Sequence, residues 1–199
     1  MRLYLATKNL HKLREYRSIL ECFDTDLDFV ALPKDYQEPE ESESSFDKNA
    51  LLKAKSAAEQ LQQWCLADDS GLVVPALNGA PGIYSARYAG KTSSDHENRQ
   101  KLLEKIKELP EEDCHAYFHC SIALAAPGGF HKIVEGRCEG FLIKEERGGQ
   151  GFGYDPLFVK AGYSKTFAQL DEKTKNRISH RRKAIDKILL QIEELLLEN

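Results

Sequence analysis

A short apolar segment, Trp64 to Ala67, ends abruptly at Asp68 to Gly71, which has the sequence Asp-Asp-Ser-Gly. A short apolar run that stops at turn-forming residues is typical of a buried strand. A carboxylate at the end of such a strand is costly unless it meets a metal ion, a cation or a reacting group. We therefore expect a fold built on a sheet that carries acidic side chains into a functional site.

Strand-like and helix-like segments alternate through the first half of the chain. Strands are expected at residues 2–6, 27–32 and 64–68, with a short extended piece at 72–74. A helix is expected from about Asn9. A second one, opened by the capping-box spacing of Ser44 and Asp47, is expected to run to about residue 63.

The second half begins with a long loop over 75–90 and then continues with a capped helix and strands. Ser94 and Glu97 have capping-box spacing and predict a helix that ends near Pro110. Further strands are expected at 114–126 and 130–138, which form a hairpin, and at 141–143 and 157–160. The last helix is expected to begin after Ser179. Alternation followed by a hairpin predicts an α/β fold with a mixed sheet.

Composition limits the class of protein. The chain has 199 residues, enough for one large domain or two tightly joined lobes. Its net charge of -4 disfavours a role in binding nucleic acid. The five cysteines form no Cys-x-x-Cys pair, which indicates reduced thiols and a cytoplasmic protein. No apolar run approaches the length of a membrane span, so no membrane partner is expected.

The charged residues are unevenly distributed. Residues 35–47 contain six acidic residues and no basic one, whereas residues 165–187 contain eight basic residues and three acidic ones. Either run alone is typical of a solvated face. Together they match a site that has one metal-binding wall and one anion-binding wall.

The segment Thr7 to Lys12 follows the first predicted strand and opens the first predicted helix. Backbone N–H groups at a helix N-terminus favour an anion. Lys8 and Lys12 are four positions apart and would share one face of a helix. The alternative is an ordinary strand–helix turn with lysines on the surface.

Asp68 and Asp69 are adjacent, so in an extended chain their side chains point to opposite faces. Asp69 is the predicted cleft residue, and Asp68 is expected to fasten the turn by accepting from backbone N–H groups. Glu40 or Glu41 would supply a second carboxylate to a metal ion. Mg²⁺ suits such a site, because it takes few protein carboxylates and bridges phosphates. The alternative is a simple Asp-Ser-Gly turn.

The glycine-rich segment Gly149 to Gly153 is not a Walker loop, because no Lys-Ser/Thr pair follows it. It is not a dinucleotide fingerprint either, because Asp155-Pro156 blocks the required helix. A flexible loop that presents the rings of Phe152 and Tyr154 to a base is one interpretation. A glycine-rich turn with buried aromatic rings is the other.

Ser179 can cap the last helix and place His180 and Arg181 in its first turn. Arg181 could bind a phosphate through two nitrogens or donate to a base carbonyl, and His180 could donate to the same oxygen. The alternative is a capped surface helix.

These segments, in this order, resemble the inosine triphosphate pyrophosphatase family. The resemblance extends from residue 6 to residue 181, and its matching segments are specific as an ordered set. They are Ala6-Thr7-Lys8-Asn9 with Lys12, Ser45-Phe46-x-x-Asn49-Ala50, Ala67-Asp68-Asp69-Ser70-Gly71-Leu72, Gly79 to Tyr88, Gly151-Phe152-Gly153-Tyr154-Asp155-Pro156 and Ile178-Ser179-His180-Arg181.

The resemblance implies a single domain over residues 1–199, with an elongated, twisted mixed sheet flanked by helices, two lobes and a central cleft, and it implies a homodimer. The implied reaction is hydrolysis of ITP, dITP and XTP to the monophosphate and pyrophosphate with Mg²⁺. Asp69 would be general base and metal ligand, with Glu40 or Glu41 as a further ligand. The remaining implied residues hold the polyphosphate (Thr7, Lys8, Asn9, Lys12) and the nucleotide (Ser70, Phe152, Gly153, Tyr154, Asp155, Lys175, His180, Arg181).

Two alternatives stay open at this point. The chain could be a related pyrophosphatase that acts on modified pyrimidine or methylated nucleotides. It could also be a regulatory nucleotide-binding or nucleic-acid-binding module without catalysis, although the net negative charge and the acidic stretch speak against this.

Overall fold

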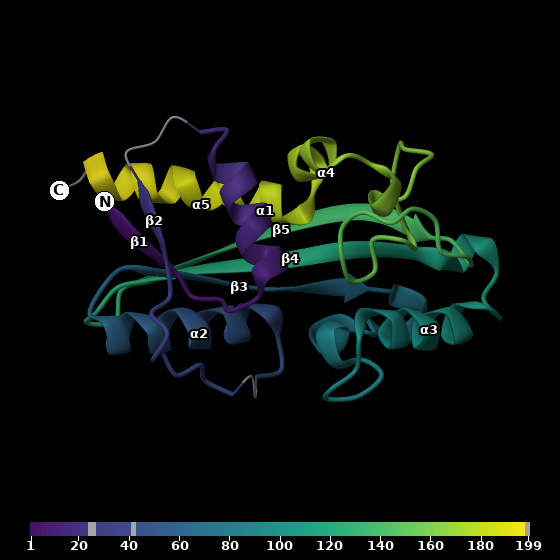
Figure 1. Cartoon of the computed structure of the whole chain (residues 1–199), viewed down its shortest axis with the longest axis horizontal. Coiled ribbons are helices and arrows are strands. Elements are labelled where there is room, and N and C mark those ends of the chain that lie inside the picture. The colour runs from purple at the N-terminus through teal and green to yellow at the C-terminus, as the bar shows by residue number, and fades with distance from the viewer. Residues whose placement is uncertain (24–26, 41–42, 198–199) are drawn as a thin grey trace. The chain divides into compact units, whose positions relative to one another are not determined.

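The computed structural model describes residues 1–23, 27–40 and 43–197. Over these residues six strands form one sheet in the order β2-β1-β3-β4-β5-β6 (Figure 1). The strands are β1 Arg2–Leu5, β2 Asp28–Ala31, β3 Cys65–Val73, β4 His115–Ala125, β5 His131–Leu142 and β6 Phe158–Lys160. The α-helices are α1 Leu10–Leu20, α2 Phe46–Leu61, α3 Asp95–Ile106, α4 Glu172–Ile178 and α5 His180–Leu197.

The strands of this sheet run in mixed directions. β1 is parallel to both β2 and β3, whereas β5 and β6 are antiparallel. β4 and β5 are long neighbouring strands (Figure 1), and the Ala126 N–H donates to the Phe130 carbonyl at 3.0 Å across the turn that joins them. The predicted α/β fold with a mixed sheet flanked by helices is confirmed.

The chain divides into two compact units, and β3, β4 and β5 contribute residues to both. The first unit comprises Met1–Asp69, Cys120–Gly136 and Arg181–Asn199, and the second comprises Ser70–His119 and Arg137–His180. That these units are the two lobes of a single domain stays a prediction.

In the first unit, β3 and β4 separate two apolar layers. Cys65 and Ala67 pack with the α2 side, whereas Leu66 packs with the side of α1 and α5. Successive side chains of a strand point to opposite faces, which produces this alternation. The α2 layer is built from small side chains that are fully buried, namely Ala50, Ala54, Ala57 and Ala58. They let the helix lie close to the sheet. Figure 1 shows α2 along one face of the strands and α5 along the other.

In the second unit, α3 packs on the ends of β3 and β4. Leu102 and Ile106 are fully buried in a cluster that also contains Phe118 and Phe158. The Ser94 side chain accepts from the Glu97 N–H, and the Glu97 carboxylate accepts from the Ser94 N–H, so the predicted capping box is confirmed.

Several predicted boundaries are wrong. Ser45, not Ser44, caps α2, and its hydroxyl accepts from the Lys48 N–H. Phe141 and Leu142 are the end of β5, and Ile143 follows it, so 141–143 is not a separate strand. The 75–90 loop contains two 3-10 helices, Pro75–Leu77 and Gly82–Arg87. α4 was not predicted, because seven residues are too few to show a clear apolar period.

The acid pair does not end a strand, contrary to the prediction. β3 continues through Asp68 and Asp69 to Val73, so both acids lie inside a nine-residue strand. The glycine at position 71 does not stop the strand, and the expected Asp-Ser-Gly turn is absent there. Among the residues that the structure describes, no helix is both long and apolar enough to cross a membrane.

Candidate active site

Asp68 and Asp69 are both buried, with 2% and 6% of their surfaces exposed. Because they are neighbours on one strand, their side chains point to opposite faces of the sheet. Asp68 lies on the side of α1 and α5, and Asp69 lies on the side of α2. The two carboxylates therefore meet different partners.

The Asp68 carboxylate lies between two cations. Its Oδ2 is 3.0 Å from the Lys12 ammonium and 3.3 Å from a guanidinium nitrogen of Arg181. A second guanidinium nitrogen of Arg181 pairs with Glu15. Asp68, Arg181 and Glu15 thus form a buried ion triad with Lys12 at its edge. A buried carboxylate needs such partners, because an isolated charge in this environment is strongly unfavourable.

The electrostatics of this cluster keep Asp68 ionised. Burial alone would raise the pKa of Asp68, but the charges of Lys12 and Arg181 outweigh burial and hold that pKa well below its usual value. The prediction that Asp68 fastens a turn is wrong, because its carboxylate pairs with side-chain cations and no turn occurs at this position.

The Asp69 carboxylate is held by α2. Its Oδ2 accepts from the Asn49 amide at 3.1 Å, and its Oδ1 is 3.6 Å from the Lys53 ammonium. Asn49 and Lys53 are four positions apart on the inward face of α2, where both are buried. Sequence reasoning missed both as partners of Asp69. Two polar residues at helical spacing on an otherwise alanine-rich stripe were the available signal.

The predicted second metal ligand is not located by the structure. Glu40 is exposed and belongs to no helix or strand. Glu41 lies outside the described residues. The pairing of Asp69 with either glutamate stays a prediction.

The turn before α1 is ordered by its own side chains. Asn9 caps the helix, and its Oδ1 accepts from the N–H groups of His11 and Lys12. The Thr7 hydroxyl accepts from the Asn9 N–H at 3.2 Å. The Lys8 ammonium donates to the Tyr36 carbonyl at 2.9 Å. Because α1 begins at Leu10, Lys8 lies outside the helix, and the prediction that Lys8 and Lys12 share a helix face is wrong.

In the second unit, a buried ion pair lies beside the glycine-rich segment. The Lys175 ammonium is 2.5 Å from the Asp155 carboxylate, and these two residues are only 5% and 2% exposed. The Phe152 N–H donates to the same carboxylate at 3.0 Å. The Lys175 ammonium also lies 4.9 Å from the centre of the Phe152 ring, a cation–π distance. Phe152, Asp155 and Lys175 are therefore brought together, and the expectation that they hold a nucleotide stays a prediction.

Tyr154 does not present its ring to a ligand. It is 3% exposed, and its hydroxyl donates to the Ser85 carbonyl at 2.9 Å. The prediction that the segment displays both aromatic rings is wrong for Tyr154, whereas Phe152 is half-buried. Ser70 is also half-buried and lies within β3.

His180 belongs to an aromatic stack in the second unit. Its ring lies 4.8 Å from the Phe118 ring at an interplanar angle of 13°, and Phe118 stacks in turn on Phe167 at 5.8 Å. Arg181, the next residue, is 1% exposed and belongs to the ion triad of the first unit. The alternative of a capped surface helix is therefore wrong for these two residues. Phe118 and Phe167 were not predicted as site residues, since their contacts join distant segments.

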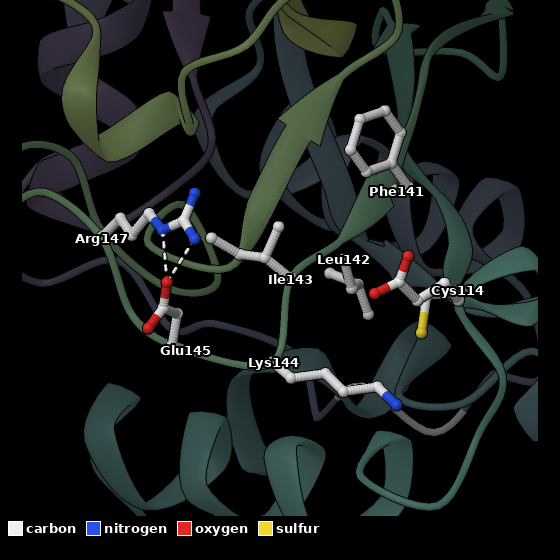
Figure 2. Close-up of a pocket in the computed structure, with 8 residues that line it drawn as sticks. Cys114, Phe141, Leu142, Ile143, Lys144, Glu145 and Arg147 are labelled. Carbon is white, nitrogen blue, oxygen red and sulfur yellow. Dashed lines mark hydrogen bonds and ion pairs between the residues drawn. The ribbon is translucent and has the colours of Figure 1, made fainter.

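A pocket of about 430 Å³ lies in the second unit, and Figure 2 shows the residues that line it. Its lining is half apolar and half charged: Cys114, Phe141, Leu142, Ile143, Glu111, Lys144, Glu145 and Arg147. The Lys144 ammonium donates to the Lys107 and Leu109 carbonyls, and Arg147 pairs with Glu145. None of the predicted site residues is among these lining residues, so the pocket is not assigned to the candidate active site.

A comparison with known protein families shows to which family this chain belongs. The sequence model of the Ham1 family matches residues 3–191. The chain belongs to the Ham1 family. The resemblance inferred from the ordered motifs is confirmed at the level of the family.

Individual Ham1 relatives match over almost their whole length. A protein of Protochlamydia amoebophila named dITP/XTP pyrophosphatase is 50% identical over 98% of this chain and 99% of its own. A Bacillus cereus protein of the same name is 44% identical over 97% of this chain and 95% of its own. Among solved structures, a HAM1 protein from Coxiella burnetii matches with a TM-score of 0.87 and 40% identity, covering 98% of this chain and 99% of that one.

Proposed function

We propose that this Ham1 protein hydrolyses the non-standard purine nucleoside triphosphates ITP, dITP and XTP to the monophosphate and pyrophosphate. The supporting observation is the near full-length similarity to relatives named dITP/XTP pyrophosphatase. The same chain holds a buried acid on β3 and a lysine–aspartate pair beside the glycine-rich segment. Both arrangements suit a substrate that combines a charged polyphosphate with a polar base.

Asp69 is the proposed general base, and it is also the proposed ligand of a divalent cation, with Glu40 or Glu41. The donor set fits Mg²⁺, because carboxylate oxygens are the protein ligands that this ion prefers. Bound Mg²⁺ would neutralise part of the triphosphate charge and polarise the phosphorus under attack. The carboxylate of Asp69 would orient a water molecule and take its proton. Asn49 and Lys53 hold this carboxylate in place from α2.

The proposed polyphosphate contacts come from the turn between β1 and α1. Lys8 and Lys12 carry positive charge there, and Thr7 and Asn9 order the backbone that leads into the helix. In this structure the two ammonium groups contact the Tyr36 carbonyl and the Asp68 carboxylate. Phosphate oxygens are stronger acceptors than a carbonyl, so substrate binding is expected to draw Lys8 onto the phosphates.

The proposed base contacts are Lys175 and His180 in the second unit, with Phe152 as a ring for stacking. Hypoxanthine and xanthine carry a 6-oxo group where adenine carries an amino group. Donors at this position pair with the oxo group, whereas an adenine amine would face other donors. A site built for a hydrogen-bond acceptor can reject the wrong group by several orders of magnitude. Ser70, Gly153, Tyr154, Asp155 and Arg181 stay proposed nucleotide-binding residues.

A panel of nucleoside triphosphates tests the proposal. The protein is incubated with Mg²⁺ and ITP, dITP, XTP, GTP, ATP, or a modified pyrimidine triphosphate, and both pyrophosphate and orthophosphate are measured. We expect pyrophosphate from ITP, dITP and XTP at rates far above those with ATP. Release of orthophosphate, or a preference for the pyrimidine, would contradict the proposal.

We also propose a homodimeric, cytoplasmic enzyme. All five cysteines are free thiols, which suits a reducing compartment. Light scattering coupled to size exclusion would give a mass near twice the 22.6 kDa of the chain. A monomer mass at micromolar concentration would contradict the dimer.

A further inference from the structure

We propose that Asp95 and Arg99 of α3 are positioning residues that orient the glycine-rich segment for nucleotide binding. Neither residue belongs to the motifs that mark the family resemblance. The inference rests on the proposed function, because it assigns the two residues a part in that reaction. It concerns only the second unit, to which α3 and residues 146–155 both belong.

The central observation is that α3 holds both backbone groups of Gly153. The Gly153 N–H donates to the Asp95 carboxylate at 2.7 Å, and the Arg99 guanidinium donates to the Gly153 carbonyl at 3.0 Å. Asp95 and Arg99 are four positions apart, so they lie on one face of the helix. Two bonds of opposite polarity from one helix face fix the orientation of both peptide planes at Gly153. We name these two bonds the Gly153 clamp.

A second contact ties the start of the same segment to the same helix. The Arg99 Nε lies 3.1 Å from the Glu146 carboxylate, and the Gln100 amide donates to that carboxylate at 3.4 Å. Arg99 therefore forms an ion pair with Glu146 near its Nε, which makes no hydrogen bond within the part of the chain that the structure describes, and donates a hydrogen bond to Gly153 from another nitrogen. The fork geometry of a guanidinium makes this double contact possible, and a lysine could not reproduce it.

The helix that carries the clamp is itself firmly placed. Its N-terminus has the Ser94–Glu97 capping box, and Leu102 and Ile106 are fully buried in the core of the second unit. Asp95 lies in the first turn of the helix, where a carboxylate is also favoured by the helix dipole. A rigid support of this kind is what a binding loop needs to keep its geometry.

The clamp acts on the residues proposed to contact the nucleotide. Gly153 has a φ of +58°, and a Cβ at this position would have open space, so glycine is needed for its backbone conformation rather than for room. On one side lies Phe152, whose ring approaches Lys175. On the other lies Tyr154, whose hydroxyl is fixed on Ser85. A change at Gly153 would therefore turn the Phe152 ring relative to Lys175.

The test compares Asp95→Ala and Arg99→Met with wild type. We expect each change to raise KM for ITP about tenfold and to leave kcat within about threefold. Asp95→Asn keeps an acceptor oxygen and should restore KM to within about threefold of wild type. Lys105→Met, at an exposed position of the same helix, is the matched control and should leave KM unchanged. A KM within twofold of wild type in both Asp95→Ala and Arg99→Met would overturn the clamp, whatever happens to kcat.

A binding measurement separates this inference from the proposed function. The Kd of ITP is measured by calorimetry for wild type and the same variants, all carrying Asp69→Asn to prevent turnover. ITP binding that is about tenfold weaker in the clamp variants supports the inference. Absence of pyrophosphate release by wild type would count against the proposed function alone. Equal Kd values count against the clamp alone. If Asp95→Ala fails to fold, the test uses the Arg99 variants alone. Arg99→Met should then weaken ITP binding, and Arg99→Gln, which keeps one donor, should restore it.

Discussion

The Lys12 ammonium lies 3.0 Å from the Asp68 carboxylate, although 56 positions separate the two residues. This ion pair joins the turn proposed to hold the polyphosphate to the strand that carries both acids. Because Arg181 shares the same carboxylate, three distant segments of the first unit meet at Asp68. The stability of the unit should therefore depend on the charge of this one side chain.

Asp68→Asn tests that dependence as a function of pH. The pKa of Asp68 is lowered in the folded protein, so its ion pairs stabilise fully above the ordinary carboxyl pKa of about 3.9, and this contribution is lost as pH falls through that value towards the folded pKa. We expect the variant to lose about 3–5 kcal/mol at pH 7, because Arg181 loses a charged partner in a buried site. Urea unfolding at several pH values should show the difference between the two proteins shrinking below pH ~4. A difference that stays constant down to pH 3 would show that the charge of Asp68 is not the cause.

Asp69→Asn tests the proposed base. Loss of a positioned general base typically costs 10²–10⁴-fold, and we expect kcat for ITP to fall about 10³-fold. The amide has nearly the shape of the carboxylate, so the circular dichroism spectrum should be unchanged. Glu59→Gln, at an exposed position of α2, is the control for removing one negative charge. Turnover near the wild-type rate in Asp69→Asn would contradict the proposal that Asp69 is the general base.

The Asp155–Lys175 pair offers a double-mutant cycle. Lys175→Met leaves a buried carboxylate without its cation, and we expect a loss of about 3–5 kcal/mol in the free energy of unfolding. The double variant Asp155→Asn/Lys175→Met removes both charges and should be more stable than Lys175→Met alone. Guanidinium unfolding of the two single variants and the double variant gives the coupling energy. Strictly additive losses would mean that the pair contributes no interaction of its own.

The cysteines should differ sharply in reactivity. Cys22 is exposed, whereas Cys65, Cys114, Cys120 and Cys138 are buried. Burial raises the pKa of the Cys65 thiol to about 12, so almost no thiolate is present at pH 8. A chromogenic disulfide reagent should therefore modify one thiol quickly in the native protein and five in denaturant. Cys22→Ser should abolish the fast phase. Rapid modification of more than one thiol in the native protein would contradict the burial of the other four.

The sequence predicts the features of this fold that local physics determines. Ser94 and Glu97 predict the start of α3 correctly, because a capping box involves only four neighbouring residues. The course of β3 was misjudged, because Asp and Gly are poor strand formers and only pairing with neighbouring strands keeps 68–71 extended.

For the candidate site, the residues could be predicted but their partners could not. Asp69 is recognisable in the sequence, whereas its contacts with Asn49 and Lys53 depend on how α2 packs against the sheet. Arg181 was expected to bind a ligand directly. The structure places it between Asp68 and Glu15, which are 113 and 166 positions away, and its role toward a ligand stays a prediction. Contacts at such separations are fixed by the fold and leave no trace in the spacing of residues.

The alanine layer of α2 has a consequence for which substitutions the protein can accept. Ala50, Ala54, Ala57 and Ala58 are fully buried, so a larger side chain at any of them would push the helix away from the strands. Asn49 and Lys53 would travel with the helix, and the Asp69 carboxylate would lose the groups that hold it. The four alanine methyl groups thus set the distance between α2 and the sheet, on which the contacts of the Asp69 carboxylate depend. A change from alanine to valine in this layer should damage turnover well before it unfolds the chain.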